Sequence, residues 1–252
     1  MSGSATTRAK DAVARLILII RDWLAGRLRF SDWGQVSGQV GLELQKIAGR
    51  RKRTEPTFDA TLTLMPSDDL RFDFTGARRT LDNVLSIERR ITAAYASGSV
   101  DYWPTPLLRM TVRAEYGDYS DGNRRRWGQV ELERRLRRDP NIFIGARATS
   151  FGFSKRLENG YFNPDSFRSA ELTARVWHRI GKRSWLDVGA ALGVENADPG
   201  GSQLAYSGKA KLTHGLSDQV EVSLTADAFS SRTRSDSGFS RQTLTAAIGL
   251  RW

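Results

Sequence analysis

The decisive stretch is TLTAAIGLRW, residues Thr243–Trp252, which alternates apolar residues with small or polar ones up to its last position. Side chains of a β-strand point in turn to opposite faces, so every second residue shares a face. One face of this stretch is apolar throughout and carries Leu244, Ala246, Ile248, Leu250 and Trp252. The pattern predicts a strand with one apolar face and one polar face.

The same alternation recurs upstream of this stretch. In residues 220–228, the apolar residues Val, Val, Leu, Ala and Ala alternate along the chain with Glu, Ser, Thr and Asp. Residues 186–194 repeat the pattern. Clusters of Gly, Asp, Asn and Pro bound such segments from about Val36 onward, as expected for strands joined by turns. We predict about twelve strands, at residues 36–46, 56–65, 69–78, 92–103, 107–118, 124–137, 140–152, 166–179, 183–195, 202–215, 218–230 and 238–252.

Two kinds of connection join these predicted strands, and they alternate along the chain. Short turn signals lie at residues 65–69, 104–106, 138–140, 180–182 and 215–218. Longer polar connections lie at residues 48–55, 79–90, 120–124, 154–166, 196–202 and 231–239. Tight turns at one end and long loops at the other are typical of outer-membrane β-barrels.

Strand length and hydropathy favour a membrane barrel over a soluble one. The predicted strands span about 10–15 residues, whereas soluble strands average about five or six and a tilted membrane strand needs about 9–11. Hydrophobic residues make up only 39% of the chain, and no run approaches the roughly 18 apolar residues of a membrane-spanning helix. Charged residues gather on the polar face, and the apolar face is rich in Ala and Gly, which would pack a soluble core poorly. We therefore predict an all-β, antiparallel, up-and-down transmembrane β-barrel.

The amino terminus differs from the rest of the chain. We predict a short N-terminal helix at residues 11–26, within a helical or linker segment at residues 1–35, and the barrel over residues 36–252. The apolar run Leu16–Ile20 is too short for a secretory signal peptide, so we expect the targeting signal to be absent from this chain. The helical stripe is formed by Val13, Leu16, Ile17, Ile20 and Leu24.

Aromatic residues gather near the ends of the predicted strands. Amphipathic rings at headgroup level form girdles around membrane barrels, although aromatic residues are also favoured in any strand. The residues expected to form the girdles are Tyr102, Trp103, Tyr116, Tyr119, Trp127, Phe151, Phe153, Tyr161, Phe162, Phe167, Trp177, Trp185, Tyr206, Phe229 and Trp252.

The chain is strongly basic, with 39 Lys and Arg against 28 Asp and Glu and a net charge of +11. This balance predicts attraction to polyanions such as lipopolysaccharide phosphates or acidic polysaccharides. Nucleic acid is not expected as a partner, because the basic residues are spread over strands. The later strands form a basic wall that extends to Arg241 and Arg251, and such rings favour anions in pores. The residues expected to line the pore and meet a substrate are Arg109, Arg113, Arg147, Arg175, Arg179, Lys209, Lys211, Glu131, Glu133 and Asp187.

Two loop stretches resemble those of known barrels. Residues 119–128 read YSDGNRRRWG, and residues 159–167 read NGYFNPDSF. Both resemble loops of the YaiO-like barrels and of the barrel domains that follow tetratricopeptide repeats in bacterial exopolysaccharide secretion porins, of the cellulose and poly-N-acetylglucosamine export type. The resemblance covers residues 36–252 and implies location in a Gram-negative outer membrane. It also implies outer-membrane lipids, lipopolysaccharide, an exopolysaccharide and its synthase or periplasmic subunits as partners.

Particular residues have expected roles within these stretches. The terminal aromatic strand, with Ile248, Leu250 and Trp252, is similar to the signal that the barrel-assembly machinery recognises. Residues 121–123 form a turn signal, and Arg124–Arg126 are expected to meet lipopolysaccharide phosphates, ligand anions or solvent alone. The rings expected to stack on sugars or to pack the barrel mouth are Tyr161, Phe162, Phe167 and Trp127.

No catalytic or cofactor site is predicted. The chain has no Cys and two His, His178 and His214, and it contains no G-x-S-x-G, H-E-x-x-H or phosphate-loop pattern. We expect neither an enzyme nor a bound metal or other cofactor. Three functions stay open: a pore for a polysaccharide or another, anionic, solute; an autotransporter-type translocation barrel with residues 11–26 in the pore; and a closed structural barrel plugged by residues 79–90.

Overall fold

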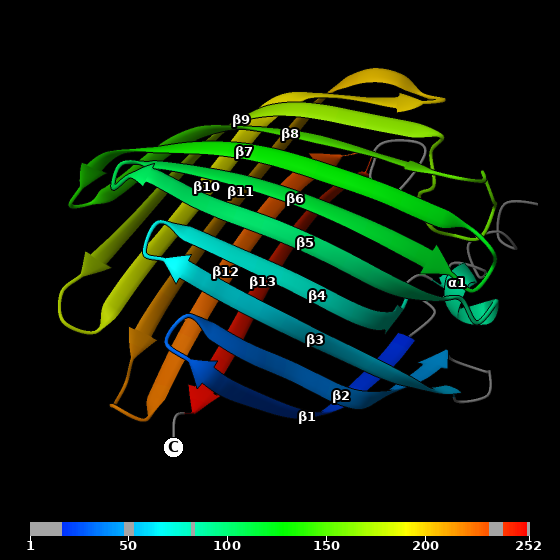
Figure 1. The fold of residues 1–252 in the computed structure, drawn as a ribbon, viewed down its shortest axis with the longest axis horizontal. Helices are drawn as coiled ribbons and strands as arrows, with labels where there is room; N and C mark the ends of the chain where they lie inside the picture. Colours follow the sequence, from blue (N-terminus) through cyan, green and yellow to red (C-terminus); the bar gives the residue numbers. More distant parts are fainter. Residues whose placement is uncertain (1–16, 48–52, 82–83, 232–238, 251–252) are drawn as a thin grey trace, which may run out of the picture.

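The computed structural model describes residues 17–47, 53–81, 84–231 and 239–250, which form one antiparallel sheet and one short helix (Figure 1). The elements are β1 (Ile17–Ser31), β2 (Gly34–Ile47), β3 (Arg53–Ser67), β4 (Leu70–Thr80), α1 (Val84–Glu88), β5 (Thr92–Thr105), β6 (Leu108–Tyr119), β7 (Arg124–Arg138), β8 (Asn141–Phe153), β9 (Ser166–Ile180), β10 (Ser184–Asp198), β11 (Gly201–Gly215), β12 (Val220–Ser231) and β13 (Phe239–Leu250).

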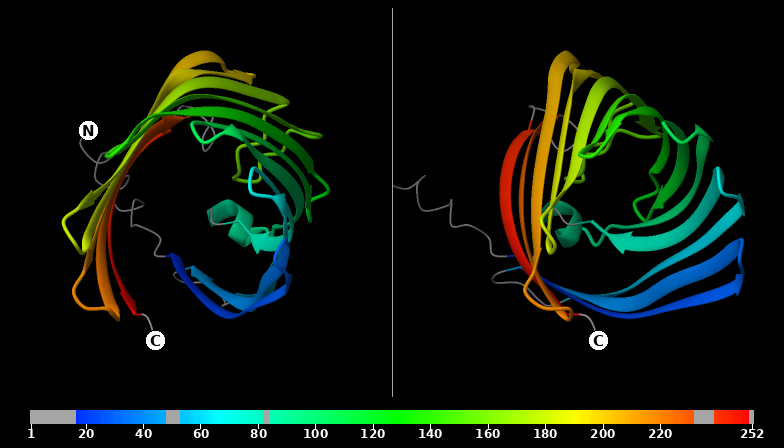
Figure 2. Two further views of the ribbon diagram at one scale, coloured as in Figure 1. Left: turned by 60° about the vertical axis from the view of Figure 1, so that its left-hand side comes forward. Right: turned by 90° about the vertical axis from the view of Figure 1, so that its left-hand side faces the viewer.

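The strands are hydrogen-bonded in chain order, from β1 to β13, in a 13-stranded sheet in which neighbours run antiparallel. The sheet curls round into a barrel-like ring, so its first and last strands lie on the same side (Figure 2). The predicted all-β, up-and-down architecture is therefore confirmed. Every strand predicted from residue 36 onward is found, as β2 to β13.

The predicted N-terminal helix is wrong within the described residues. Residues 17–26 belong to strand β1, which pairs with β2 through partners such as Leu24 and Val40, so the sheet begins before residue 36. Residues 11–16 of the predicted helix lie outside the described residues. The error has a simple cause: Ile20, Leu24 and Leu28 are four residues apart, a spacing that shares one face in a helix and in a strand alike. Leu24 and Leu28 are exposed on the face that carries Val40.

The connections at the two ends of the sheet differ, as predicted. One end, here called the turn end, has tight turns at residues 32–33, 68–69, 106–107, 139–140, 181–183 and 216–219. The opposite loop end carries the longer connections at residues 81–91, which include α1, and at residues 154–165 (Figure 1). The predicted long connection at residues 196–202 is wrong, because β10 and β11 extend until only residues 199–200 separate them.

Within the described residues, no helix is long and apolar enough to cross a bilayer.

The two faces of the sheet have opposite chemistry. One row of residues that pair with one another across consecutive strands points outward, and its side chains are exposed; the exposed fraction of Leu172 is 72%. This row consists of Tyr102, Met110, Leu132, Ala146, Leu172, Leu192 and Tyr206. The residues next to these along each strand point inward, because side chains alternate between the two faces. This inward row consists of Asp101, Thr111, Glu131, Arg147 and Glu171. Asp101 and Thr111 are buried. A soluble barrel would place its apolar face inside, so this sheet has the inverse arrangement, as membrane barrels do.

Two small clusters of buried apolar residues lie at the loop end. One contains Ile91, Ala93 and Tyr119, and the other contains Phe151, Phe167 and Ala197. Several aromatic residues predicted for the girdles instead pack against these clusters: Trp127, Phe153, Tyr161 and Phe162. These rings lie on strands or loops that face the barrel mouth, whereas Tyr102, Tyr116 and Tyr206 are exposed on the outward face.

Candidate functional site

Strand register places all ten predicted pore-lining residues on the inward face, which makes the barrel lumen the candidate site. Arg109 lies opposite Glu133, and Arg147 lies between Glu131 and Glu171. The others occupy inward positions of β6, β9, β10 and β11: Arg113, Arg175, Arg179, Asp187, Lys209 and Lys211. The register brings these residues to one wall, and their role in transport stays a prediction.

Ion pairs along the lumen wall join neighbouring strands. Arg109 on β6 contacts Asp101 on β5 at 2.7 Å and Glu133 on β7 at 3.8 Å. The same kind of contact joins Arg125 to Glu115, Arg147 to Glu171 and Arg175 to Asp187. Each of these pairs links a strand to the next one in the sheet. These side chains therefore line the wall and do not bridge the lumen.

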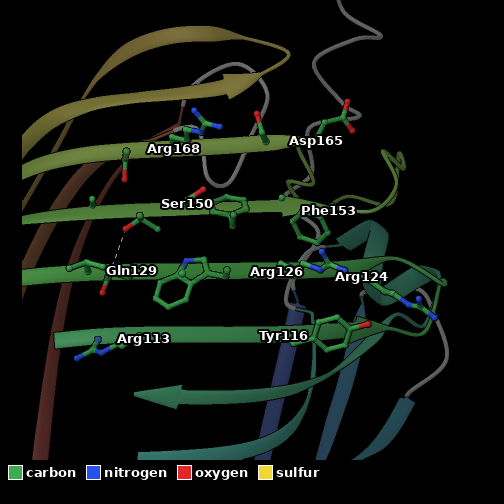
Figure 3. Close-up of a pocket in the computed structure, with 18 of the residues that line it drawn as sticks. Arg113, Tyr116, Arg124, Arg126, Gln129, Ser150, Phe153, Asp165 and Arg168 are labelled. Atoms are coloured by element: carbon green, nitrogen blue, oxygen red, sulfur yellow. Dashed lines mark hydrogen bonds between the residues drawn. The ribbon is translucent and has the colours of Figure 1, made fainter. Parts of the chain in front are cut away.

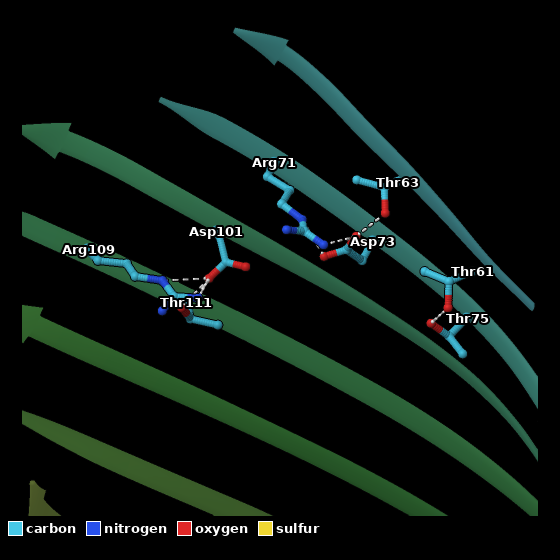
Figure 4. Close-up of polar contacts among 8 residues, drawn as sticks. All are labelled: Thr61, Thr63, Arg71, Asp73, Thr75, Asp101, Arg109 and Thr111. Carbon is cyan, nitrogen blue, oxygen red and sulfur yellow. Dashed lines mark hydrogen bonds and ion pairs between the residues drawn. The ribbon is translucent and has the colours of Figure 1, made fainter. Parts of the chain in front are cut away.

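Hydrogen bonds also hold several carboxylates of the wall in place. Asp101 accepts from Arg109 Nε at 3.0 Å and from the hydroxyl of Thr111, and on β4 the Nε of Arg71 donates to Asp73 at 2.9 Å (Figure 4). A carboxylate that accepts several hydrogen bonds is held in one rotamer. The inward face is thus a fixed polar surface in these strands.

The predicted basic wall is partly neutralised. Arg147 and Arg175 are paired with carboxylates, so they contribute little net charge. Arg113, Lys209 and Lys211 make no ion pair with any described residue and leave positive charge on the inward face. The side chain of Arg241, and Arg251 as a whole, lie outside the described residues.

A cavity of about 650 Å³ lies inside the barrel near the loop end. Its aromatic lining is held by ring contacts: Phe151 stacks on Phe167 at 4.5 Å, and Tyr119 stacks on Tyr161 at 5.1 Å. Trp127 and Phe162 complete this lining, so the four predicted aromatic contact residues come together here. The polar lining includes Arg125, Gln129, Arg147, Glu171 and Glu195. Flat rings beside fixed hydrogen-bonding groups can bind a ligand that has apolar faces and hydroxyl edges.

One residue of the mouth was missed by the sequence analysis. Asn123 is fully buried, and its Nδ2 donates to the carbonyl of Lys155 at 2.8 Å and to the Tyr161 hydroxyl at 3.0 Å. Its Oδ1 accepts from the backbone N–H groups of Arg124 at 2.9 Å and Lys155 at 3.0 Å and from the Ser154 hydroxyl at 3.1 Å. Asn123 therefore fixes the start of the 154–165 loop to the β6–β7 turn.

Helix α1 docks on the same loop. The Ser86 hydroxyl, which is fully buried, donates to the carbonyl of Asn159 at 2.7 Å, and Arg89 contacts the Asn159 side-chain oxygen. Asn159 in turn donates to Asp121 at 2.7 Å. Figure 2 shows α1 inside the outline of the ring. Helix α1, the described helix of the 79–90 connection that was predicted as a plug, thus lies in the mouth, next to the aromatic cavity.

The environment of Tyr161 predicts a pH dependence of this mouth structure. Burial raises the pKa of the Tyr161 phenol above its ordinary value, and its hydrogen bond to Asp121 acts in the same direction. The neutral phenol is therefore favoured in the folded state, so its contribution to stability is present below about pH 10 and is lost as the pH rises through the folded-state pKa. The measurement is the absorbance at 295 nm, where tyrosinate absorbs, as the pH is raised. The difference between wild type and Tyr161→Phe isolates Tyr161, and in the folded protein it should appear well above pH 10. In guanidinium chloride, which unfolds the protein, the same difference should appear near pH 10. Equal titration midpoints in the folded and the unfolded protein would contradict the raised pKa of Tyr161.

The remaining predicted residues lie away from the lumen. Ile248 of the expected assembly signal is 74% exposed on β13, whereas the side chain of Leu250, and Trp252 as a whole, lie outside the described residues. His178 lies 3.6 Å from Asp139, and His214 lies 2.8 Å from the Ser184 hydroxyl, both at the turn end.

Comparison with known proteins supports the fold. No known protein family matches the chain, and no curated protein matches its sequence. A solved structure described as a bacterial polysaccharide outer membrane secretin superposes with a TM-score of 0.72 at 12% identity, over 94% of this chain and 91% of that one. The beta domain of the Bordetella autotransporter BrkA gives a TM-score of 0.32 at 12% identity, over 92% of this chain and 97% of that one. The first similarity establishes that this chain shares the secretin's fold.

Proposed function

We propose that the chain is an outer-membrane β-barrel whose lumen passes a polysaccharide or another solute through the membrane. One observation carries this proposal: the exposed face of the sheet is apolar across β5 to β11, and the enclosed face is charged. An apolar exterior is stable against lipid, whereas in water it would leave a continuous hydrophobic band exposed.

The chemistry of the lumen favours a glycan as the solute. Pyranose rings have apolar CH faces that stack on aromatic rings and hydroxyl edges that hydrogen-bond to charged side chains. The lumen cavity supplies both, with Tyr161 and Phe167 beside Arg125 and Glu171. The unpaired Arg113, Lys209 and Lys211 further favour anionic solutes. The similarity in fold to a polysaccharide secretin is consistent with this assignment.

The autotransporter alternative loses its structural basis. It required residues 11–26 to thread the pore as a helix, but residues 17–26 are part of β1 and pair with β2. The closed-barrel alternative keeps one observation in its favour, since α1 and the 154–165 loop lie in the mouth.

The experiment that tests the proposal starts with the chain refolded in detergent. A folded barrel should migrate faster without boiling than after boiling. In a planar bilayer it should then conduct ions with an anion preference, and a uronic acid oligosaccharide should interrupt the current. Heat-modifiable mobility without any current would contradict a pore and favour the closed barrel. A protein that stays monodisperse without detergent would contradict the membrane placement itself.

Charge reversal in the lumen should change ion selectivity. In Lys209→Glu/Lys211→Glu, two unpaired inward cations become anions, so the ratio of anion to cation permeability should fall from above one to below one. The measurement is the reversal potential in a potassium chloride gradient. As a matched control, Arg134→Glu/Lys182→Glu makes the same change of charge on the outward face and in a turn, and selectivity should stay nearly unchanged. Equal shifts in both variants would contradict a conduction path along β11.

A further inference from the structure

A second hollow lies on the outward face, at the loop end of β6 to β9 (Figure 3). It has a volume of about 1280 Å³, and small residues on β7 and β8, namely Gly128, Ser150 and Gly152, form its floor. A Cβ at Gly152 would lie 2.4 Å from the carbonyl oxygen of Asp165, so only glycine fits there. The exposed Val112 and Val130 border the hollow on the side of the apolar band.

The Arg124–Arg126 run is divided between the two faces of β7. Arg125 points inward, where its guanidinium lies 3.3 Å from Glu115 and 4.9 Å from the ring centre of Phe151. Arg124 and Arg126 line the outward hollow. The alternation of the strand therefore assigns two of the three cations to the outside and one to the lumen.

Arg168 joins these two cations from another strand. Arg168 lies opposite Ser150, and Arg126 lies opposite Gly152, so the two side chains flank β8 from either side (Figure 3). Neither makes an ion pair with any described residue, whereas Arg124 lies 3.8 Å from Asp118 in a largely exposed contact. Asp165 is the single carboxylate among the described residues that line the hollow. The hollow is therefore cationic and has donors free for a ligand.

We propose that this hollow binds the phosphorylated glycolipid of the outer leaflet, with its phosphate on Arg126 and Arg168 and its acyl chains along the apolar band. The inference rests on the proposed membrane placement and adds a specific ligand site to it. Guanidinium groups bind phosphate through paired, charge-assisted hydrogen bonds. Tyr116, exposed beside Arg126, is suited to the interface where headgroup and acyl chain meet.

The position of the hollow distinguishes a lipid from a transported solute. Arg126 and Arg168 lie on the face opposite to the lumen, so a solute in the pore does not reach them. A free anion would contact only the guanidinium groups of Arg126 and Arg168. A lipid would also cover the exposed Val112 and Val130 in the next rows of the outward face.

Native mass spectrometry of the refolded, full-length chain in detergent tests the proposal. The probes are bisphosphorylated hexa-acyl lipid A, the same lipid after removal of both phosphates, and inorganic phosphate. We expect bound lipid A on the wild-type chain and at least about tenfold weaker binding by Arg126→Gln/Arg168→Gln, since each lost guanidinium removes a charge-assisted contact. The matched control is Arg134→Gln/Arg138→Gln, which removes two cations from the other end of β7 and should bind within about twofold of wild type.

Three results would overturn the site: equal losses in both double variants, equal binding of the dephosphorylated lipid, or displacement of lipid A by millimolar inorganic phosphate. The dephosphorylated arm uses only the wild-type chain, so it decides the question even if the variant does not refold. Failure of this site alone would leave the conductance in a planar bilayer intact, whereas failure of the proposed pore function would abolish that conductance.

Discussion

Replacing Leu172 with arginine should destabilise the folded barrel by about 2–4 kcal/mol, the range known for a cation placed at the bilayer midplane on the lipid face of a barrel. Leu172 is 72% exposed and lies in the middle of the apolar outward row, between Ala146 and Leu192. The free energy of unfolding in lipid vesicles, from reversible guanidinium titrations followed by tryptophan fluorescence, is the quantity to measure.

The neighbouring residue provides the control for this change. Thr173 is next in the strand and faces the lumen, so Thr173→Arg should cost less than about 1 kcal/mol, because lumen substitutions chiefly change selectivity. A larger loss from Thr173→Arg than from Leu172→Arg would mean that the apolar face is inside, and that the barrel is a soluble one.

Replacing Asn123 with alanine should release the 154–165 loop from the mouth. The change removes five hydrogen bonds and takes from the backbone N–H and carbonyl of Lys155 their partner. A buried polar group left unsatisfied costs about 1–3 kcal/mol, so local opening of the loop should become about tenfold to a hundredfold more frequent. Trypsin cleavage after the exposed Lys155 and Arg156, timed on the refolded protein, measures this opening.

Asn196 is the matched control for this second change. It lies at the same end of the sheet and is exposed, and within the described residues its side chain makes one hydrogen bond, to the Ser202 hydroxyl at 2.8 Å. Asn196→Ala should leave the cleavage rate near that of wild type. If Asn123→Ala also leaves it unchanged, the loop is held chiefly by the stacking of Tyr161 on Tyr119, and Tyr161→Ala should then release it.

Most of the sheet could be predicted from the sequence, because a strand with one apolar face leaves a period of two that no helix shares. Strand β1 could not, since Ile20, Leu24 and Leu28 are spaced by four residues, a spacing that fits a helix as well as a strand. The aromatic residues show a different limit. Their place near strand ends was predictable, and alternation along β7 puts Trp127 on the face of Glu131, but the packing of Trp127 against Phe151 and Phe167 depends on neighbouring strands.

The lumen was more predictable than the mouth. Residues two apart on a strand share a face, so the inward position of Arg109, Arg113 and Glu131 follows from local spacing. The contacts of Asn123 with Ser154, Lys155 and Tyr161 join residues that are 31 to 38 apart along the chain, and nothing local in the sequence marks them. The turn signal at residues 121–123 indicates a bend there, but not the buried network that the bend supports.

The order of the strands has a consequence for how the molecule is made. Because each described strand pairs with its neighbours along the chain, hairpins can be added one after another without waiting for a distant partner. The bond from Ser86 to Asn159 spans 73 residues and can form only after the hairpins between them are in place. We therefore expect biogenesis to form the curled sheet first and to join α1 to the 154–165 loop at its mouth last.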